Sequence, residues 1–225
     1  MEKETKLRQQ LLDAALHMSR SGLSPGRSGN VSARFDQGFL ITASGLSYEE
    51  MCIEDLVFVD AQGESRHSFL QPSSEWRFHH DIYHRFPEAG AIVHCHSRHA
   101  TALACDNCEI PAFHYMVAVA GGRKIPLAPY ALFGTQALSD HVTGALDGVR
   151  ACLLAHHGLV AYGADVASAL ELAFEVEELA AQYVLVRGLG STRLLSDRQM
   201  DEVIERFKTY GSAAKGEHRE KGNRA

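Results

Sequence analysis

The order of extended and helical segments constrains the fold of this chain more than any other feature of its sequence. Short runs typical of strands come first and follow one another, and later runs alternate with segments of helical apolar spacing. The predicted strands cover residues 31–35, 39–42, 56–59, 91–96, 151–154 and 159–162, with a short extended piece at 125–127. This order predicts an α/β domain in which helices flank a mixed sheet.

The predicted helices are marked by apolar residues three and four positions apart and by start and stop signals. One begins after the sequence PSSE at residues 72–75 and continues to Phe86. The others cover residues 6–20, 97–104, 135–146, 166–186 and 197–210. We find no internal repeat and no linker-like stretch, so we expect one domain over residues 1–211 and a polar, mobile tail over 212–225.

Composition and charge exclude several classes of protein. The chain carries 28 acidic and 22 basic residues, and this net charge of −6 disfavours a non-specific nucleic-acid partner. It contains no run of 18 apolar residues, so we expect no membrane-spanning helix. A charged start, MEKETKLRQQ, predicts no secretory signal, and five cysteines without such a signal favour reduced thiols and a cytoplasmic location.

Histidine is the unusual residue, with 13 copies of which several are clustered. His94 and His96 lie two apart on a predicted strand and therefore point to the same face, whereas Cys95 points into the core. Zinc and similar metals favour two such imidazoles. One histidine of the His156-His157 pair and the carboxylate of Glu75 could complete a site. Three histidines and a carboxylate with an open position would be a catalytic arrangement.

Other interpretations of these residues remain open. A His-x-His pair on a strand is often structural, and we expect His79, His80, His84 and His99 on helix surfaces. The Cys105–Cys108 pair is a rival zinc motif, although a structural zinc normally needs a second pair of this kind.

Three short segments are suited to binding a phosphate group. They are Gly29-Asn30 after a loop of small residues, residues 42–45 after a strand, and Ser73-Ser74 at a helix start. Small residues expose backbone N–H groups, hydroxyls add donors, and a helix N-terminus adds a favourable dipole. The chain has neither a Walker lysine motif nor a GxGxxG motif, so nucleotide binding is not indicated.

Many short motifs match one known family in order and with few gaps, from about residue 5 to residue 211. They are SGNVS at 28–32, PSSEWRFH at 72–79, VHCH at 93–96, HYM at 114–116, AGG at 120–122, IPLAPYA at 125–131, FGT at 133–135, HHGL at 156–159 and FKTYG at 207–211. On these residues the chain resembles the class II (metal-dependent) aldolase and adducin superfamily, and within it the sugar-phosphate aldolases of the L-fuculose 1-phosphate type. The resemblance implies a three-layer fold with a largely antiparallel central sheet.

The resemblance also implies roles for individual residues. His94, His96 and His157 match zinc ligands, and cobalt or manganese could replace zinc. Glu75 matches a catalytic glutamate that can also ligate the metal, and Tyr115 a catalytic tyrosine supplied by a neighbouring subunit. The implied phosphate-binding residues are Gly29, Asn30, Ser44, Gly45, Ser73 and Ser74. Ser44 replaces a threonine of the relative but keeps the hydroxyl. The implied aldehyde-side residues are Phe133, Phe207 and Tyr210.

The implied function is reversible cleavage of a ketose 1-phosphate to dihydroxyacetone phosphate and a small aldehyde. It would proceed in a homotetramer of C4 type with interfacial active sites. The sequence leaves three alternatives open. One is an aldolase for 5-deoxyribulose or 5-methylthioribulose 1-phosphate, and another is a ribulose-phosphate 4-epimerase or methylthioribulose-1-phosphate dehydratase. The third, a non-catalytic adducin-like scaffold, should have lost the metal-binding histidines, which this chain keeps.

Overall fold

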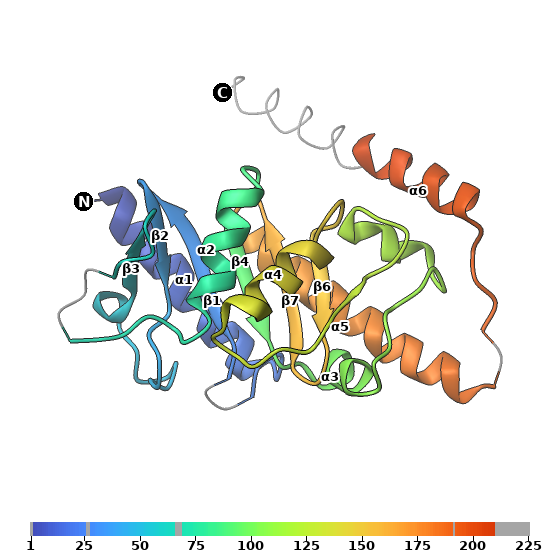
Figure 1. Ribbon diagram of the computed structural model, residues 1–225, viewed down its shortest axis with the longest axis horizontal. Coiled ribbons are helices and arrows are strands. Elements are labelled where there is room, and N and C mark those ends of the chain that lie inside the picture. Colours follow the sequence, from blue (N-terminus) through green and yellow to red (C-terminus); the bar gives the residue numbers. More distant parts are fainter. Residues whose placement is uncertain (1, 26–27, 66–68, 191, 210–225) are drawn as a thin grey trace, which may run out of the picture.

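A single twisted sheet forms the centre of the molecule (Figure 1). The computed structural model describes residues 2–25, 28–65, 69–190 and 192–209. The sheet has seven strands in the order β3-β2-β1-β4-β7-β6-β5. They are β1 (Asn30–Phe35), β2 (Gly38–Ile41), β3 (Val57–Asp60), β4 (Ala91–Cys95), β5 (Leu127–Ala128), β6 (Ala151–Leu154) and β7 (Gly158–Gly163). Only β5 and β6 pair in parallel, so the prediction of a mixed, largely antiparallel sheet is confirmed.

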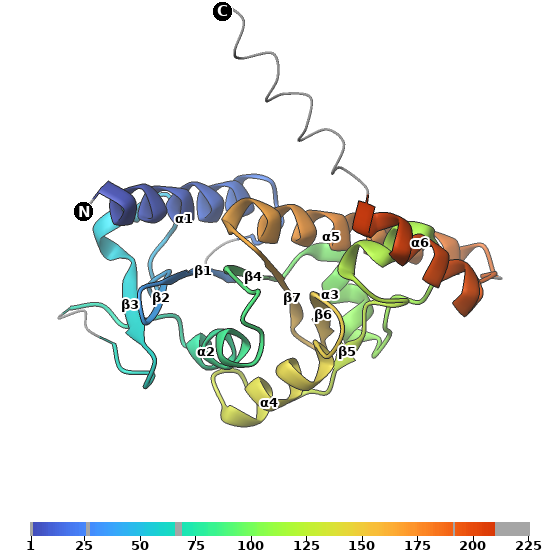
Figure 2. The ribbon, with the colours of Figure 1, turned by 90° about the horizontal axis from the view of Figure 1, so that it is seen from above.

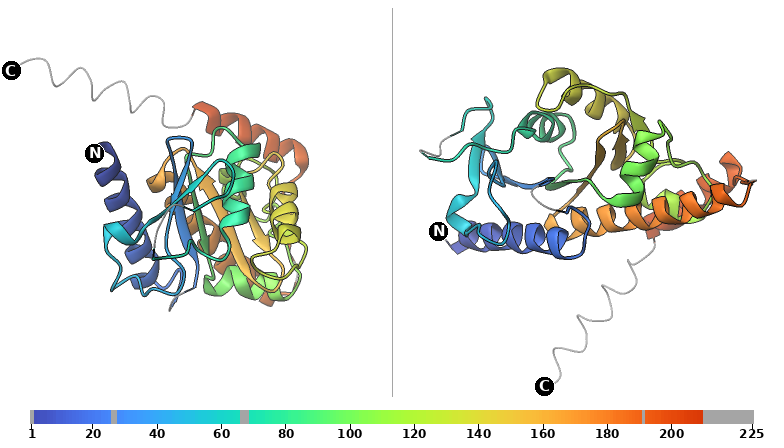
Figure 3. Two further views of the ribbon diagram at one scale, coloured as in Figure 1. Left: turned by 60° about the vertical axis from the view of Figure 1, so that its left-hand side comes forward. Right: turned by 90° about the horizontal axis from the view of Figure 1, so that it is seen from below.

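Helices cover both faces of this sheet. They are α1 (Glu2–Arg20), α2 (Trp76–Arg85), α3 (Arg98–Cys105), α4 (Gln136–Ala145), α5 (Val166–Gly188) and α6 (Asp197–Thr209). Helices α1 and α5 lie on one face and α2 and α4 on the other (Figures 2 and 3). Each helix of the two layers turns an apolar stripe toward the sheet, and the large buried side chains Phe39, Phe78 and Ile92 fill the space between.

Element boundaries agree with the sequence-based predictions to within a few residues. Two short 3-10 helices, η1 (Ile53–Asp55) and η2 (Tyr115–Ala120), lie in segments where we predicted no element. Such short turns have no periodic pattern; η2 begins where the His114 side chain accepts a hydrogen bond from the Met116 backbone N–H. The predicted end of the domain at 211 and the tail over 212–225 lie outside the described residues and stay predictions.

Three central strands bring the candidate functional residues together at one end of the sheet, where these strands begin or end. Strand β4 is antiparallel to both β1 and β7, so the start of β1, the end of β4 and the start of β7 meet. In this register Asn30 pairs with His94, and Cys95 pairs with Leu159. As expected, Cys95 is fully buried.

No helix of the described residues is long and apolar enough to cross a membrane.

Candidate active site

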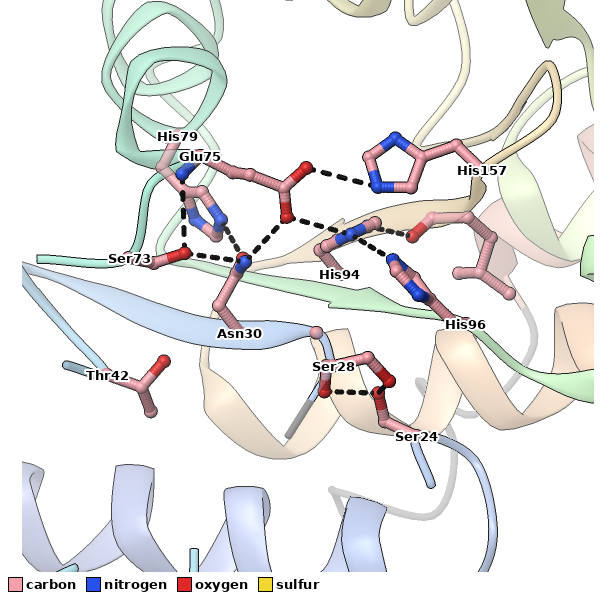
Figure 4. Close-up of polar contacts among 12 residues, drawn as sticks. Ser24, Ser28, Asn30, Thr42, Ser73, Glu75, His79, His94, His96 and His157 are labelled. Atoms are coloured by element: carbon pink, nitrogen blue, oxygen red, sulfur yellow. Dashed lines mark hydrogen bonds and ion pairs between the residues drawn. The ribbon is translucent and has the colours of Figure 1, made fainter. Parts of the chain in front are cut away.

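Three histidines converge at this end of the central strands (Figure 4). His94 lies on β4 and is fully buried, His96 follows β4 directly, and His157 lies in the turn between β6 and β7. One ring nitrogen from each histidine lies within 4.8 Å of those of the other two. Within the described ranges this is the only such group of three or more histidine, cysteine or acidic side chains, and Cys105 and Cys108 do not belong to one.

The backbone sets the direction in which His94 faces. Its Nδ1 lies 2.9 Å from the Leu159 carbonyl oxygen and must carry the proton, because a carbonyl can only accept. Its Nε2 faces the cluster, 3.1 Å from Nε2 of His96. Burial by itself lowers the pKa of His94, but the facing Glu75 carboxylate outweighs this effect and raises it, whereas burial lowers the pKa of His96 to about 3.

The turn that carries His157 depends on a glycine. A Cβ at Gly158 would lie 2.4 Å from the Cys95 carbonyl oxygen and 2.9 Å from the His96 ring. Contacts this short are not tolerated, so only glycine lets β7 start beside the end of β4. The preceding His156 has φ of 56° and donates its backbone N–H to the Ala104 carbonyl. Its ring faces Asn107, and it is His157 whose ring joins the cluster.

Glu75 supplies a carboxylate to the same cluster from the N-terminus of α2. Oε2 lies 3.1 Å from His94 Nε2, and Oε1 lies 3.1 Å from His157 Nε2. Burial of the Glu75 carboxyl by itself raises its pKa, but His94 and His157 outweigh this effect and hold the pKa well below its ordinary value. Glu75 is therefore ionised at neutral pH.

These donors fit a bound divalent cation. The buried Glu75 Oε1 lacks a hydrogen bond although it faces His157, and Nε2 of His94 and Nε2 of His96 lie only 3.1 Å apart. Buried polar atoms are normally satisfied. A cation would satisfy these atoms together, and three imidazoles with a carboxylate suit zinc-like metals.

A cavity of about 380 Å³ opens beside the cluster and is lined by every residue that we predicted to bind phosphate. These residues are Gly29, Asn30, Ser44, Gly45, Ser73 and Ser74, and Glu75, His96, His157 and Phe133 line the same cavity. Gly29 has φ of 80°, and a Cβ there would lie 2.6 Å from the His94 carbonyl oxygen. Glycine therefore brings the first loop directly against the histidine-bearing strand.

Two of the predicted residues line a different cavity. Tyr115, which is 49% exposed, and Phe207 line a cavity beside α6. The predicted Tyr210 lies outside the described residues. The expectation that His79 is a surface residue was wrong, because it is fully buried between the sheet and α2. The position of His79 on the inner face of α2, one turn after Glu75, was the signal that would have shown this.

Sequence reasoning missed two tyrosines that line the cavity. Tyr48 is buried and donates its hydroxyl to the Gly29 carbonyl at 2.7 Å, so it supports the first loop. Tyr130 is exposed and lies near His156. Tyr130 falls within a matched motif, whereas nothing local in the sequence singles out Tyr48, because its contact is made across 19 residues.

Comparison with known proteins shows the family of this chain. The family model for the class II aldolase and adducin N-terminal domain matches residues 9–184. The chain is 49% identical over 208 residues to 5-methylthioribulose-1-phosphate/5-deoxyribulose-1-phosphate aldolase of Rhodospirillum rubrum, covering 92% of this chain and 94% of that protein. It is 48% identical over 207 residues to L-fuculose phosphate aldolase of Escherichia coli (strain K12), covering 92% of this chain and 96% of that protein.

A solved structure of an L-fuculose 1-phosphate aldolase shares the whole architecture. It superimposes with a TM-score of 0.86 at 36% identity and covers 90% of this chain and 96% of that chain. The chain therefore belongs to the class II aldolase and adducin family.

Proposed function

We propose that this protein is a metal-dependent aldolase that reversibly cleaves a ketose 1-phosphate into dihydroxyacetone phosphate and a small aldehyde. One observation carries the proposal: the Glu75 carboxylate contacts His94 and His157 of the three-histidine cluster, beside the cavity that the small-residue loops line. Relatives named as sugar-phosphate aldolases over more than nine tenths of the chain support it.

His94, His96 and His157 would hold the metal, and we propose zinc, with cobalt or manganese as substitutes. A bound zinc would supply Lewis-acid stabilisation of the negative charge that develops on substrate oxygens as the C3–C4 bond breaks. Glu75 would move the proton at C3, because it is ionised and lies at the metal cluster. The loop residues would hold the phosphate group and fix the position of C1.

Tyr115 would exchange the proton of the C4 hydroxyl, acting from a neighbouring subunit. Its exposed position away from the Glu75 cavity of its own chain supports this assignment. We therefore propose a homotetramer of C4 type with active sites at subunit interfaces. Phe133, which lines the cavity, and its neighbour Leu132 are exposed apolar side chains suited to such an interface. Phe133, Phe207 and Tyr210 would line the aldehyde side.

The phosphate assignment predicts the effect of a negative charge at Ser74. Ser74→Asp should raise the KM for the ketose 1-phosphate at least tenfold, because like charges brought together at a binding site cost several kcal/mol. Steady-state dihydroxyacetone phosphate release tests this, with Ser74→Ala as the matched control. Equal KM values for the aspartate and alanine variants would contradict phosphate binding at this helix start.

Two ketose phosphates compete as the physiological substrate. The Rhodospirillum rubrum relative is named for 5-methylthioribulose and 5-deoxyribulose 1-phosphates, and the Escherichia coli relative for L-fuculose phosphate. Their identities to this chain differ by a single percentage point, 49% against 48%, so similarity does not choose between them. An apolar pocket discriminates a methyl or thioether group by only about 1–3 kcal/mol. We therefore expect activity on both.

The deciding experiment measures dihydroxyacetone phosphate release from L-fuculose 1-phosphate and 5-methylthioribulose 1-phosphate side by side, each with and without a chelator. We expect chelator-sensitive release from both, and the ratio of the kcat/KM values identifies the better substrate. If folded, metal-loaded protein releases none from either, the aldolase proposal fails and epimerase and dehydratase assays follow.

A further inference from the structure

A line of buried polar side chains runs from Glu75 into the interior, away from the cavity. Glu75, His79 and Tyr83 lie four residues apart and share one face of α2. Asn30 and Ser32 lie two apart on β1 and share the face that looks at this helix. Two matched polar stripes therefore meet between the sheet and α2, and Figure 4 shows the end that reaches the histidine cluster.

Hydrogen bonds join these side chains without a gap. Asn30 Nδ2 lies 3.1 Å from Glu75 Oε2 and 2.9 Å from Ser73 Oγ, and Asn30 Oδ1 is in hydrogen-bond contact with His79 Nε2. On the other side of the ring, His79 Nδ1 lies 2.7 Å from Ser32 Oγ, which lies 2.8 Å from the Tyr83 hydroxyl.

The Asn30 amide sets the direction of the hydrogen bonds in this line. Its Nδ2 donates to Glu75 Oε2 and Ser73 Oγ, and its carbonyl oxygen, which can only accept, faces His79. His79 Nε2 must then carry a proton and donate to that carbonyl. Burial lowers the pKa of His79 to about 3, so the ring is neutral and its Nδ1 accepts from Ser32. Ser32 in turn accepts from Tyr83.

The opposite direction would break the contact between Asn30 and Glu75. If His79 carried its proton on Nδ1, Asn30 would turn its carbonyl oxygen toward Glu75. The hydrogen bond that Asn30 Nδ2 donates to Glu75 Oε2 would then be lost, and the Asn30 carbonyl would face the Glu75 carboxyl group in its place. His79 and Ser32 are fully buried and Asn30 is 1% exposed, so water cannot readily relieve such a conflict.

We propose that His79 is a positioning residue, which holds the Asn30 amide in the orientation that directs the Glu75 carboxylate toward the three histidines. His79 touches neither the cavity nor the histidine cluster through a hydrogen bond, and it acts through Asn30. The proposal deepens the proposed aldolase function and rests on it for its effect on turnover, whereas the orientation itself is a property of the folded chain.

The orientation can be tested on the wild-type protein without any assay of activity. In protein labelled with nitrogen-15 histidine, the His79 ring should show a slowly exchanging proton on Nε2 and an unprotonated Nδ1 at neutral pH. The signal is assigned by its absence from His79→Phe, or from His79→Gln if the phenylalanine variant does not fold. A proton on Nδ1 instead would overturn the proposal.

A double-mutant cycle tests whether His79 acts through Asn30. His79→Phe keeps a planar ring among Phe39 and Phe78 but removes the donor. It should lower kcat/KM and zinc affinity about 10–100-fold, as loss of a group that supports a ligand typically does. In an Asn30→Ala background, His79→Phe should lower kcat/KM and zinc affinity less than about threefold, because the amide through which His79 acts is already absent. Equal losses in both backgrounds would mean a purely structural role and overturn the proposal.

Two further variants sharpen the cycle. His79→Gln places an amide N–H near the position of Nε2 and should restore most of the loss. Failure of this rescue in a folded protein counts against the proposal. His84→Gln, one turn along α2 from His80 and exposed, is the matched control and should behave like the wild type. If the wild type cleaves neither phosphate, the aldolase proposal fails, while zinc affinity and the ring spectrum still decide the role of His79.

Discussion

Replacing Glu75 with glutamine is expected to lower kcat for ketose 1-phosphate cleavage by a factor of about 10²–10⁴, the usual contribution of a positioned proton-transfer group. Glutamine has nearly the shape of glutamate and can still accept a hydrogen bond from Asn30, but it cannot take up and release a proton. The KM should change much less, because the phosphate-binding loops are untouched.

Proton exchange on dihydroxyacetone phosphate, measured without the aldehyde, tests the role of Glu75 separately from cleavage. Dihydroxyacetone phosphate in D₂O should exchange one carbon-bound proton with the wild-type enzyme, and Glu75→Gln should lose this exchange together with cleavage. Tyr115→Phe should lose cleavage but keep the exchange, because no C4 hydroxyl takes part in it. Proton NMR follows both reactions.

A surface carboxylate provides the control for this pair. Glu178→Gln on α5 removes a carboxylate that accepts a hydrogen bond from Gln182 on the same helix and should leave both rates unchanged. If Glu75→Gln retains proton exchange at the wild-type rate, Glu75 is not the group that moves the C3 proton.

Local sequence patterns predicted the parts of this protein that depend on neighbours in the chain. The alternation around His94 and His96 showed that both rings share a face, because a strand has a strict period of two. The sequence PSSE predicted a helix start after residue 75, and α2 begins at Trp76, although its N-cap residue Glu75 makes no side-chain capping hydrogen bond. These residues lie where the pattern placed them because local geometry alone decides their direction.

Local sequence patterns could not predict the contacts between segments that are far apart in the chain. Asn30 meets Glu75 across 45 residues, and His79 meets Ser32 across 47. The four-residue spacing places Glu75 and His79 on one face of α2, but it does not show which partners cover that face, and the adjacent His80 is only half-buried. The packing of α2 against β1 encloses His79, and that packing depends on the whole sheet.

Loss of the metal should reduce activity more than any loop substitution, by at least about three orders of magnitude. Lewis-acid stabilisation contributes several kcal/mol, and each 1.36 kcal/mol corresponds to a factor of ten. Chelation should leave the fold intact, because the sheet and both helix layers have their own apolar core. The melting temperature should nevertheless fall, since a bound ion whose free concentration is 100 times its Kd increases the free energy of unfolding by about 2.7 kcal/mol.

The two adjacent histidines give a sharp test of which side chain holds the metal. His157→Asn should lower both metal content and activity, whereas His156→Asn should keep one metal per chain, because the His156 ring faces Asn107. Asparagine tolerates the positive φ of residue 156, so backbone strain does not confuse the comparison. Metal analysis, dihydroxyacetone phosphate release and circular dichroism are measured together. Loss of metal from the His156 variant alone would reverse the assignment, and loss of secondary structure on chelation would make the metal a structural one.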